Sequence, residues 1–235
     1  MSTDNQASLK LAGWDTPPKS EKYAITLEDE APASINTQVD AYTFTQTSEE
    51  GTFPTTGFTG ATFTIVPKDG KKATDYNWTS DASGWVSVTD GVVVFTGTGT
   101  GSKVTITGTP TSGQGKIIKY SFTLKSWFIN NGNTMLVFPA ANTYCSGLSG
   151  YSLPTVQQLN GNSSHNNGHR GTLGGLWSEW GRLGAYSGGA GFSGANYWSS
   201  VRESNDIHYI VSLNNGYVVS HYDSNTDFVV CRQGL

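Results

Sequence analysis

The sequence predicts a mainly β protein, in which a β-sandwich is followed by an α+β domain. Glycine is abundant, at 29 of 235 residues, and 12% of the residues are aromatic. Charged residues make up 14%, below the roughly 25% that is usual in soluble domains. Short alternating apolar segments recur between turn residues, whereas long helical patterns do not, and this favours strands.

An uneven distribution of charges predicts two domains that meet near Ser126. All lysines lie at or before Lys125, and all arginines, histidines and cysteines lie after it. We expect a polar tail or linker over residues 1–20, a β-sandwich over 21–125 and an α+β domain over 126–235. The start of the chain lacks the apolar segment of a signal peptide. We therefore favour a piece of a longer exported protein over a cytosolic protein.

The first domain shows the alternation expected of strands. Phe63 and Ile65 alternate with polar residues in "ATFTIVP", and "IKYSFTL" (118–124) has the same period of two. In "WVSVTDGVVVF", Asp90–Gly91 separates two β-branched runs, which predicts a hairpin with a two-residue type I′ turn. Short strands with regularly spaced turn signals are typical of a sandwich.

One glycine-rich segment, "GTGTGSK" (97–103), resembles a phosphate-binding loop only superficially. That loop needs a lysine directly after its last glycine, and a helix must follow. Here Ser102 separates Gly101 from Lys103, and the β-like "VTITG" comes next. We expect a glycine-rich hairpin turn instead.

The second domain begins with a strand and two short helices. Pro139 suits the first turn of a helix that carries Cys145 and ends at Gly147. Thr155 and Gln158 have the spacing of a capping box, which predicts the start of the second helix.

A third apolar pattern precedes the last strands. The leucines and tryptophans of "LGGLWSEWGRL" (173–183) fit one helical stripe, which its two adjacent glycines weaken. "IHYIVSLNNGYVVSHY" predicts a hairpin with Asn215–Gly216 at the turn, and "DFVVCRQ" predicts the final strand. We expect Trp177 and Trp198 to be core residues.

Cys145 and Cys231 are the only cysteines. Because an early helix and a terminal strand can meet in one α+β domain, we predict a disulfide between them. It would close a loop of about 86 residues and stabilise the fold by roughly 4 kcal/mol. Such a bond persists only in an oxidising compartment. Two free buried thiols are the alternative.

Both domains resemble the intimin and invasin family of bacterial outer-membrane adhesins. The segment "YNWTSDASGWVSVTDGVVVFTGTGTGSKVTITGTP" is similar to the bacterial Ig-like domains of such adhesins. The second domain resembles the C-type lectin-like domain that ends these proteins. That likeness rests on Cys145, "LPT" (153–155), "NYWSS" (196–200), "YIVSLNNGYV" (209–218) and "FVVCRQ" (228–233). The order of the two domains is also that of the family.

The resemblance implies the exposed tip of an adhesin that a β-barrel holds in the bacterial outer membrane. The lectin-like domain would bind a host protein, and the Ig-like domain would be a stiff spacer. An integrin, a bacterial receptor delivered into the host membrane and an immunoglobulin are possible partners. Two alternatives stay open. One is a calcium-independent glycan-binding module with an aromatic platform, and the other is a structural surface module that mediates bacterial self-association.

We expect no cofactor, no metal and no enzymatic activity. The sequence lacks the Glu-Pro-Asn or Gln-Pro-Asp loop of sugar-binding C-type lectins, "SNDI" (204–207) lacks their tryptophan, and no acidic cluster offers the oxygen ligands of calcium. His165 and His169 lie in "HNNGH", whose composition favours a solvated loop over a zinc-binding helix. No nucleophile-elbow motif occurs.

Nucleic acid and membrane are also not expected as partners. The net charge of −4 gives no basic footprint for nucleic acid. No segment approaches the roughly 20 apolar residues that a membrane-spanning helix needs.

The long irregular region over about residues 160–195 is the predicted partner-binding surface. It is rich in glycine, serine and asparagine, and binding residues concentrate on loops held by a rigid scaffold. Arginine and aromatic side chains dominate the energetics of protein interfaces. The predicted partner-binding residues are Arg170, Trp180, Arg182, Tyr186 and Phe192. For Trp180, a core position is the open alternative.

Overall fold

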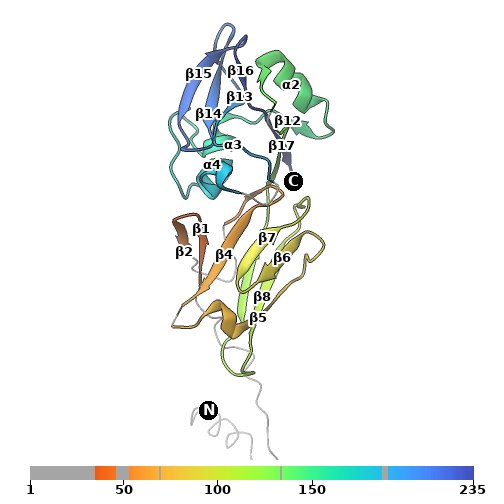
Figure 1. Ribbon diagram of the computed structural model, residues 1–235, viewed down its shortest axis with the longest axis vertical. Coiled ribbons are helices and arrows are strands. Elements are labelled where there is room, and N and C mark those ends of the chain that lie inside the picture. Colours follow the sequence, from red (N-terminus) through yellow and green to blue (C-terminus); the bar gives the residue numbers. More distant parts are fainter. Residues whose placement is uncertain (1–34, 46–52, 69, 133, 187–189) are drawn as a thin grey trace, which may run out of the picture. The chain divides into compact units, whose positions relative to one another are not determined.

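Strands dominate the computed structural model (Figure 1). It describes residues 35–45, 53–68, 70–132, 134–186 and 190–235. The tail predicted over residues 1–20 lies outside these residues. Residues 32–235 group into one compact unit, so the predicted boundary near Ser126 stays a prediction.

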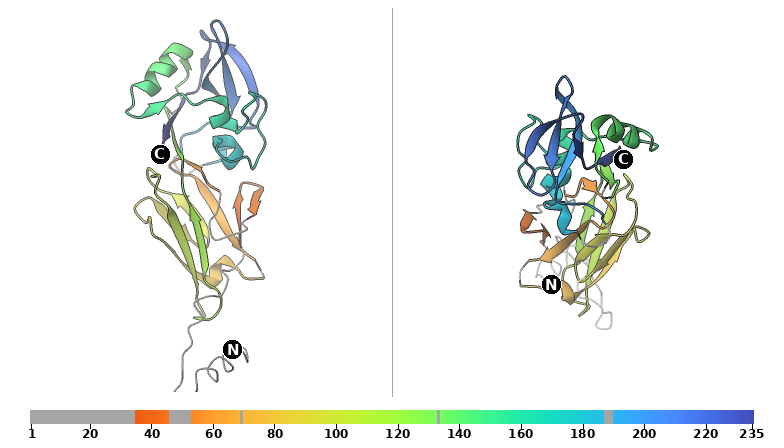
Figure 2. Two further views of the ribbon diagram at one scale, coloured as in Figure 1. Left: turned by 180° about the vertical axis from the view of Figure 1, so that it is seen from behind. Right: turned by 45° about the horizontal axis from the view of Figure 1, so that its top comes forward.

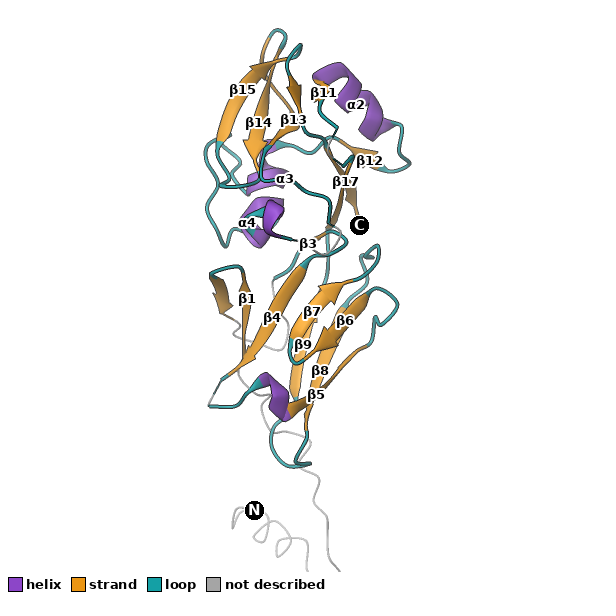
Figure 3. Cartoon of the chain, in the orientation of Figure 1, coloured by secondary structure: helices purple, strands orange, loops and turns teal. Residues whose placement is uncertain are grey.

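Two antiparallel sheets form the sandwich of the first half (Figure 3). The first sheet has the order β2-β1-β4-β7-β6, and the second has the order β5-β8-β9. The strands of the first sheet are β1 (Ile35–Val39), β2 (Tyr42–Thr45), β4 (Thr62–Pro67), β6 (Val86–Thr89) and β7 (Val92–Phe95). Those of the second are β5 (Tyr76–Ser80), β8 (Val104–Pro110) and β9 (Ile118–Phe122), and the 3-10 helix η1 (Ala73–Asp75) precedes β5.

The local patterns of the first half predict most of this sandwich. Phe63 and Ile65 are buried, and β6 and β7 pair around the two-residue turn Asp90–Gly91. Both turn residues have positive φ, 48° and 77°, as a type I′ turn requires. The segment 97–103 is a loop, but it is not the predicted hairpin, because β7 and β8 belong to different sheets.

Three smaller sheets and three α-helices build the described part of the second half. The sheet orders are β12-β17-β10-β3, β13-β14-β15 and β11-β16. The strands are β10 (Ser126–Asn130), β11 (Leu136–Val137), β12 (Tyr151–Ser152), β13 (Asn196–Ser204), β14 (Ile207–Ser212), β15 (Val218–Tyr222), β16 (Thr226–Asp227) and β17 (Val230–Gly234). The helices are α2 (Phe138–Ser146), α3 (Val156–Asn160), α4 (Leu176–Trp180) and the 3-10 helix η2 (Leu183–Ala185).

One strand of the second half is contributed by the first. β3 (Thr56–Gly57) pairs in parallel with the start of β10. The last strand, β17, returns antiparallel to β10 on its other side (Figure 2). Backbone pairing therefore joins the two halves of the chain.

Helix ends follow the predicted caps, except in the apolar segment 173–183. Gly147 caps α2, and Thr155 forms the capping box of α3 with Gln158. α4 covers only residues 176–180, because Gly175 is its N-cap and Gly181, with φ 73°, ends it. Leu173, predicted on the same stripe, is 38% exposed. Among the described residues, none of the helices has the length and apolar character to cross a membrane.

The predicted disulfide is confirmed. Cys145 on α2 and Cys231 on β17 are bonded, with a Cα–Cα distance of 5.3 Å. Both are fully buried in a small apolar cluster that includes Trp198. The alternative of two free thiols is therefore wrong, and the core positions expected for Trp177 and Trp198 are confirmed.

Candidate partner-binding surface

The irregular region after α3 is held by asparagine side chains. Asn160 is fully buried, and its Nδ2 donates to the carbonyl oxygens of Asn166 (2.9 Å) and Gly216 (3.1 Å). The Asn167 side chain accepts from the backbone N–H of Val218 at 3.0 Å. These bonds tie the loop to the β14–β15 connection.

Glu179 is a buried carboxylate that joins α4 to the first half of the chain. Its Oε2 accepts from the backbone N–H groups of Thr55 (2.9 Å) and Thr56 (3.0 Å) and from Thr56 Oγ1 (2.9 Å). Its Oε1 accepts from the N–H of Gly174 (2.7 Å) and from the Thr55 hydroxyl. Burial raises the pKa of this carboxyl, and the hydrogen bonds oppose that shift.

Arg170, a predicted partner-binding residue, uses its donors inside the protein. Nη1 donates to the carbonyl oxygens of Trp177 (3.1 Å) and Ser178 (2.7 Å), and Nη2 donates to that of Val39 (3.1 Å). The guanidinium also lies over the Tyr42 ring, 5.3 Å from its centroid. Burial lowers the pKa of Arg170. These contacts give Arg170 a role in joining α4 to β1. Arg170 is half-buried, and its predicted contact with a partner stays a prediction.

Trp180 and Phe192 are core residues, which corrects their prediction as partner-binding residues. They are 0% and 8% exposed. Trp180 donates from Nε1 to Thr56 Oγ1 at 2.9 Å, and both aromatic rings contact Phe58 edge-on. The physical reason is that α4 packs its tryptophan against the end of the sandwich. The open alternative for Trp180, a core position, is the one the structure shows.

Tyr186 is half-buried, and Arg182 is exposed. The Tyr186 hydroxyl donates to the carbonyl oxygen of Trp180 at 2.7 Å, and burial raises its pKa. Of the five predicted residues, Arg182 therefore presents its side chain most fully to solvent. Nothing in the structure tests its predicted contact with a partner, which stays a prediction.

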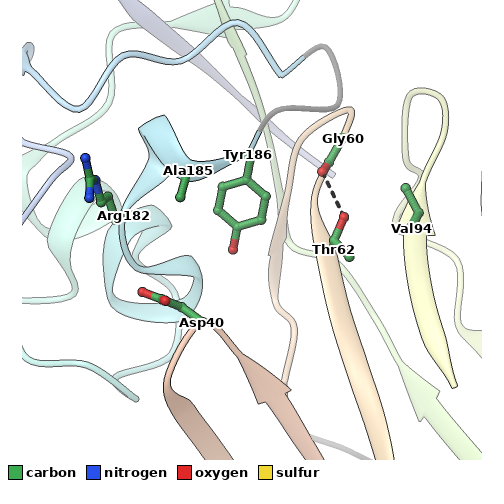
Figure 4. Close-up of a pocket in the computed structure, with 7 residues that line it drawn as sticks. All are labelled: Asp40, Gly60, Thr62, Val94, Arg182, Ala185 and Tyr186. Carbon is green, nitrogen blue, oxygen red and sulfur yellow. Dashed lines mark hydrogen bonds between the residues drawn. The ribbon is translucent and has the colours of Figure 1, made fainter.

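Arg182 lines two hollows on the surface. The first, about 490 Å³, is lined by Asp40, Gly60, Thr62, Val94, Arg182, Ala185 and Tyr186 (Figure 4). The second, about 470 Å³, is lined by Asp40, Ala41, Tyr42, Arg170, Trp177, Gly181, Arg182, Asn214, Asn215 and Tyr217. We call the two together the junction groove, because they share Asp40 of the β1–β2 turn and Arg182.

A second exposed surface, which the sequence patterns did not indicate, lies on β15. This strand lies at the edge of the sheet β13-β14-β15. Val219 is 52% exposed and Tyr222 is 62% exposed. They point to opposite faces of the sheet, because side chains alternate along a strand, so the edge position leaves both open to solvent. We call Val219 and Tyr222 the β15 surface. The edge position could not be read from the local pattern.

Two His–Asp pairs hold the end of β15. His208 on β14 pairs with Asp223 at 2.6 Å, and His221 on β15 pairs with Asp227 at 2.7 Å. Burial raises the pKa of Asp227, and His221 opposes that shift. The strand that carries the β15 surface is thus fixed by side chains as well as by its pairing with β14.

The two histidines of "HNNGH" do not gather metal ligands around them. His165 and His169 are exposed in the loop after α3, and the His165 ring lies 5.2 Å from the Tyr209 ring. Within the described ranges, no group of three or more His, Cys, Asp or Glu residues is placed to hold a metal ion.

Comparison with known proteins agrees with this architecture. The family described as "Invasin, domain 4" matches residues 33–122. The inverse autotransporter adhesin YeeJ of Escherichia coli (strain K12) is 41% identical over 169 residues, which is 70% of this chain and 7% of YeeJ. The chain therefore spans a small part of the length of this curated relative.

Solved structures share the fold over most of the chain. The crystal structure of invasin, a bacterial integrin-binding protein, has a TM-score of 0.72 and 25% identity, covering 87% of this chain and 40% of that one. An intimin mutant from EHEC O157:H7 has a TM-score of 0.56 and 17% identity, covering 87% and 99%. An intimin fragment in complex with the translocated intimin receptor has a TM-score of 0.61 and 15% identity, covering 86% and 66%. The chain belongs to the intimin/invasin family of bacterial adhesins, with an Ig-like sandwich followed by a C-type lectin-like domain.

Proposed function

We propose that this chain is the cell-surface tip of an outer-membrane adhesin, and that its lectin-like domain binds a host protein through the β15 surface. The family supports adhesion: YeeJ is an adhesin, invasin is an integrin-binding protein, and intimin forms a complex with the translocated intimin receptor. The partner classes remain an integrin, a bacterial receptor delivered into the host membrane, and an immunoglobulin.

The observation that carries the choice of surface is the exposed tyrosine on an edge strand. An edge strand offers unpaired backbone N–H and C=O groups to another chain, and partner chains bind such edges in extended form. Tyrosine is among the residues that dominate interface energetics. Because Val219 and Tyr222 flank the edge of β15 on opposite faces, a chain aligned with β15 would contact both.

The Ig-like domain serves as a stiff support in this proposal. Glu179 and Arg170 bind backbone groups of Thr55, Thr56 and Val39 in the first half, and β3 pairs with β10. Buried charge-assisted hydrogen bonds are stronger than neutral ones. A partner that pulls on the lectin-like domain would therefore load both halves together.

Adhesion of protein-coated beads to cultured human epithelial cells tests this function. We expect V219K and Y222A to reduce bead binding about tenfold or more, which corresponds to about 1.4 kcal/mol. Y144A is the matched control, because Tyr144 is an exposed tyrosine on α2. Trypsin treatment of the cells should abolish binding, whereas glycosidase treatment should not.

Each contrary outcome has a distinct meaning. If beads carrying the wild-type chain fail to bind any host cell, host adhesion by this chain is refuted. If V219K and Y222A bind as well as Y144A, the β15 surface is refuted while adhesion stands. Concentration-dependent self-association in sedimentation, without cell binding, would support the structural alternative.

A further inference from the structure

We propose that the junction groove is a binding site for a neutral oligosaccharide, separate from the β15 surface. Its two hollows, about 490 and 470 Å³, adjoin at Asp40 and Arg182, which line both. Each lies in the size range of small-ligand sites. A ligand in either hollow would contact Asp40 and Arg182.

The side chains that line the second hollow match the chemistry of a sugar. A pyranose has an apolar C–H face, and its hydroxyl groups both donate and accept hydrogen bonds. Tyr217 is 57% exposed and lines the hollow, so its ring offers an open face for C–H stacking. Asn214, Asn215 and Asp40 add amide and carboxylate groups to the lining. The amides can donate and accept hydrogen bonds, and the carboxylate can accept them.

The groove carries charges of both signs, which favours a neutral ligand over a strongly charged one. Arg170 and Arg182 are the two cations of its lining. Asp40 is the carboxylate that both hollows share. Asp40 and Glu179 both act electrostatically on Arg170. These carboxylates offset part of the positive charge that an acidic sugar would meet.

The groove is preformed, so little ordering opposes binding. Arg170 is fixed by three backbone carbonyl oxygens and by the Tyr42 ring. The Asn215 side chain accepts from the backbone N–H of Tyr217 at 3.2 Å, which fixes the backbone that carries the tyrosine. Rigid sites bind more tightly because they lose less conformational entropy.

Saturation-transfer NMR on the full chain tests this site. The probes are lactose, N-acetyllactosamine and chitotriose at millimolar concentration, with 3′-sialyllactose as the acidic comparison. We expect transfer to the ring C–H protons of at least one neutral probe. Y217A should weaken that signal about fivefold or more, a change of about 1 kcal/mol in binding, and D40N should weaken it as well.

The control is Y222A, because Tyr222 is an equally exposed tyrosine outside the groove. It should leave the sugar signal unchanged while impairing bead adhesion, so the two proposals fail separately. No transfer to any neutral probe overturns the inference. So does transfer to the acidic probe only, or a signal that Y217A, D40N and Y222A leave equally intact. Circular dichroism melting of each variant separates lost binding from lost folding.

Discussion

Glu179→Gln is the substitution that most directly tests how the two halves are joined. Glu179 accepts five hydrogen bonds, from Thr55, Thr56 and Gly174. Glutamine replaces one carboxylate oxygen by an NH2 group, which can only donate. The threonine hydroxyls can rotate to accept from it, but the backbone N–H of Gly174 cannot. That N–H would therefore face a second donor.

The expected loss follows from these contacts. An unsatisfied buried donor costs about 1–3 kcal/mol. The remaining hydrogen bonds change from charge-assisted to neutral and lose strength. Because burial raises the pKa of Glu179, removing the buried charge compensates for that loss. The unsatisfied donor therefore sets the effect, and we expect E179Q to lower the free energy of unfolding by about 2 kcal/mol, or Tm by about 4–8 °C for a folded unit of this size.

Urea denaturation and calorimetry at neutral pH measure this effect. Glu203→Gln is the matched control, because Glu203 is exposed on β13, and it should change the unfolding free energy by about 0.5 kcal/mol or less. The reasoning is refuted if E179Q is as stable as E203Q, since the buried carboxylate would then not stabilise the junction.

Three further predictions follow from single contacts. Because burial raises the pKa of Glu179, the folded state binds its proton more tightly than the unfolded state. The difference in unfolding free energy between the wild type and E179Q should thus be greatest below the ordinary glutamate pKa. It should fall as pH rises through the raised pKa of Glu179. Urea titrations of both proteins at several pH values measure this difference. Replacing Cys145 and Cys231 by serine should cost roughly 4 kcal/mol, and reductant should lower the Tm of the wild type only. Gly216→Ala should lower Tm far more than Gly70→Ala. Both glycines have φ near 75°, but only a Cβ at position 216 would meet the Trp177 ring, at 2.3 Å. Equal melting temperatures of the two variants would contradict this.

Local patterns in the sequence determined much of the secondary structure. The Asp90–Gly91 hairpin, the capping box of Thr155 and the Gly147 cap of α2 all occur as predicted. Each depends on backbone dihedrals and hydrogen bonds within a few residues, so neighbouring residues suffice to specify it. The order of helix and terminal strand also predicted the Cys145–Cys231 disulfide.

The tertiary structure alone decided which side chains of residues 160–195 face solvent. Trp180 and Arg170 have the composition of a binding loop, yet their partners, Thr56 and Val39, lie 124 and 131 residues away in the chain. The same is true of the groove, where Asp40 and Arg182, from the two halves of the chain, line the same hollow. The alternation of a strand shows which residues share a face, but not whether the strand is central or at an edge. The exposure of Val219 and Tyr222 therefore depended on where β15 lies in its sheet, because burial is set by long-range packing that no local pattern contains.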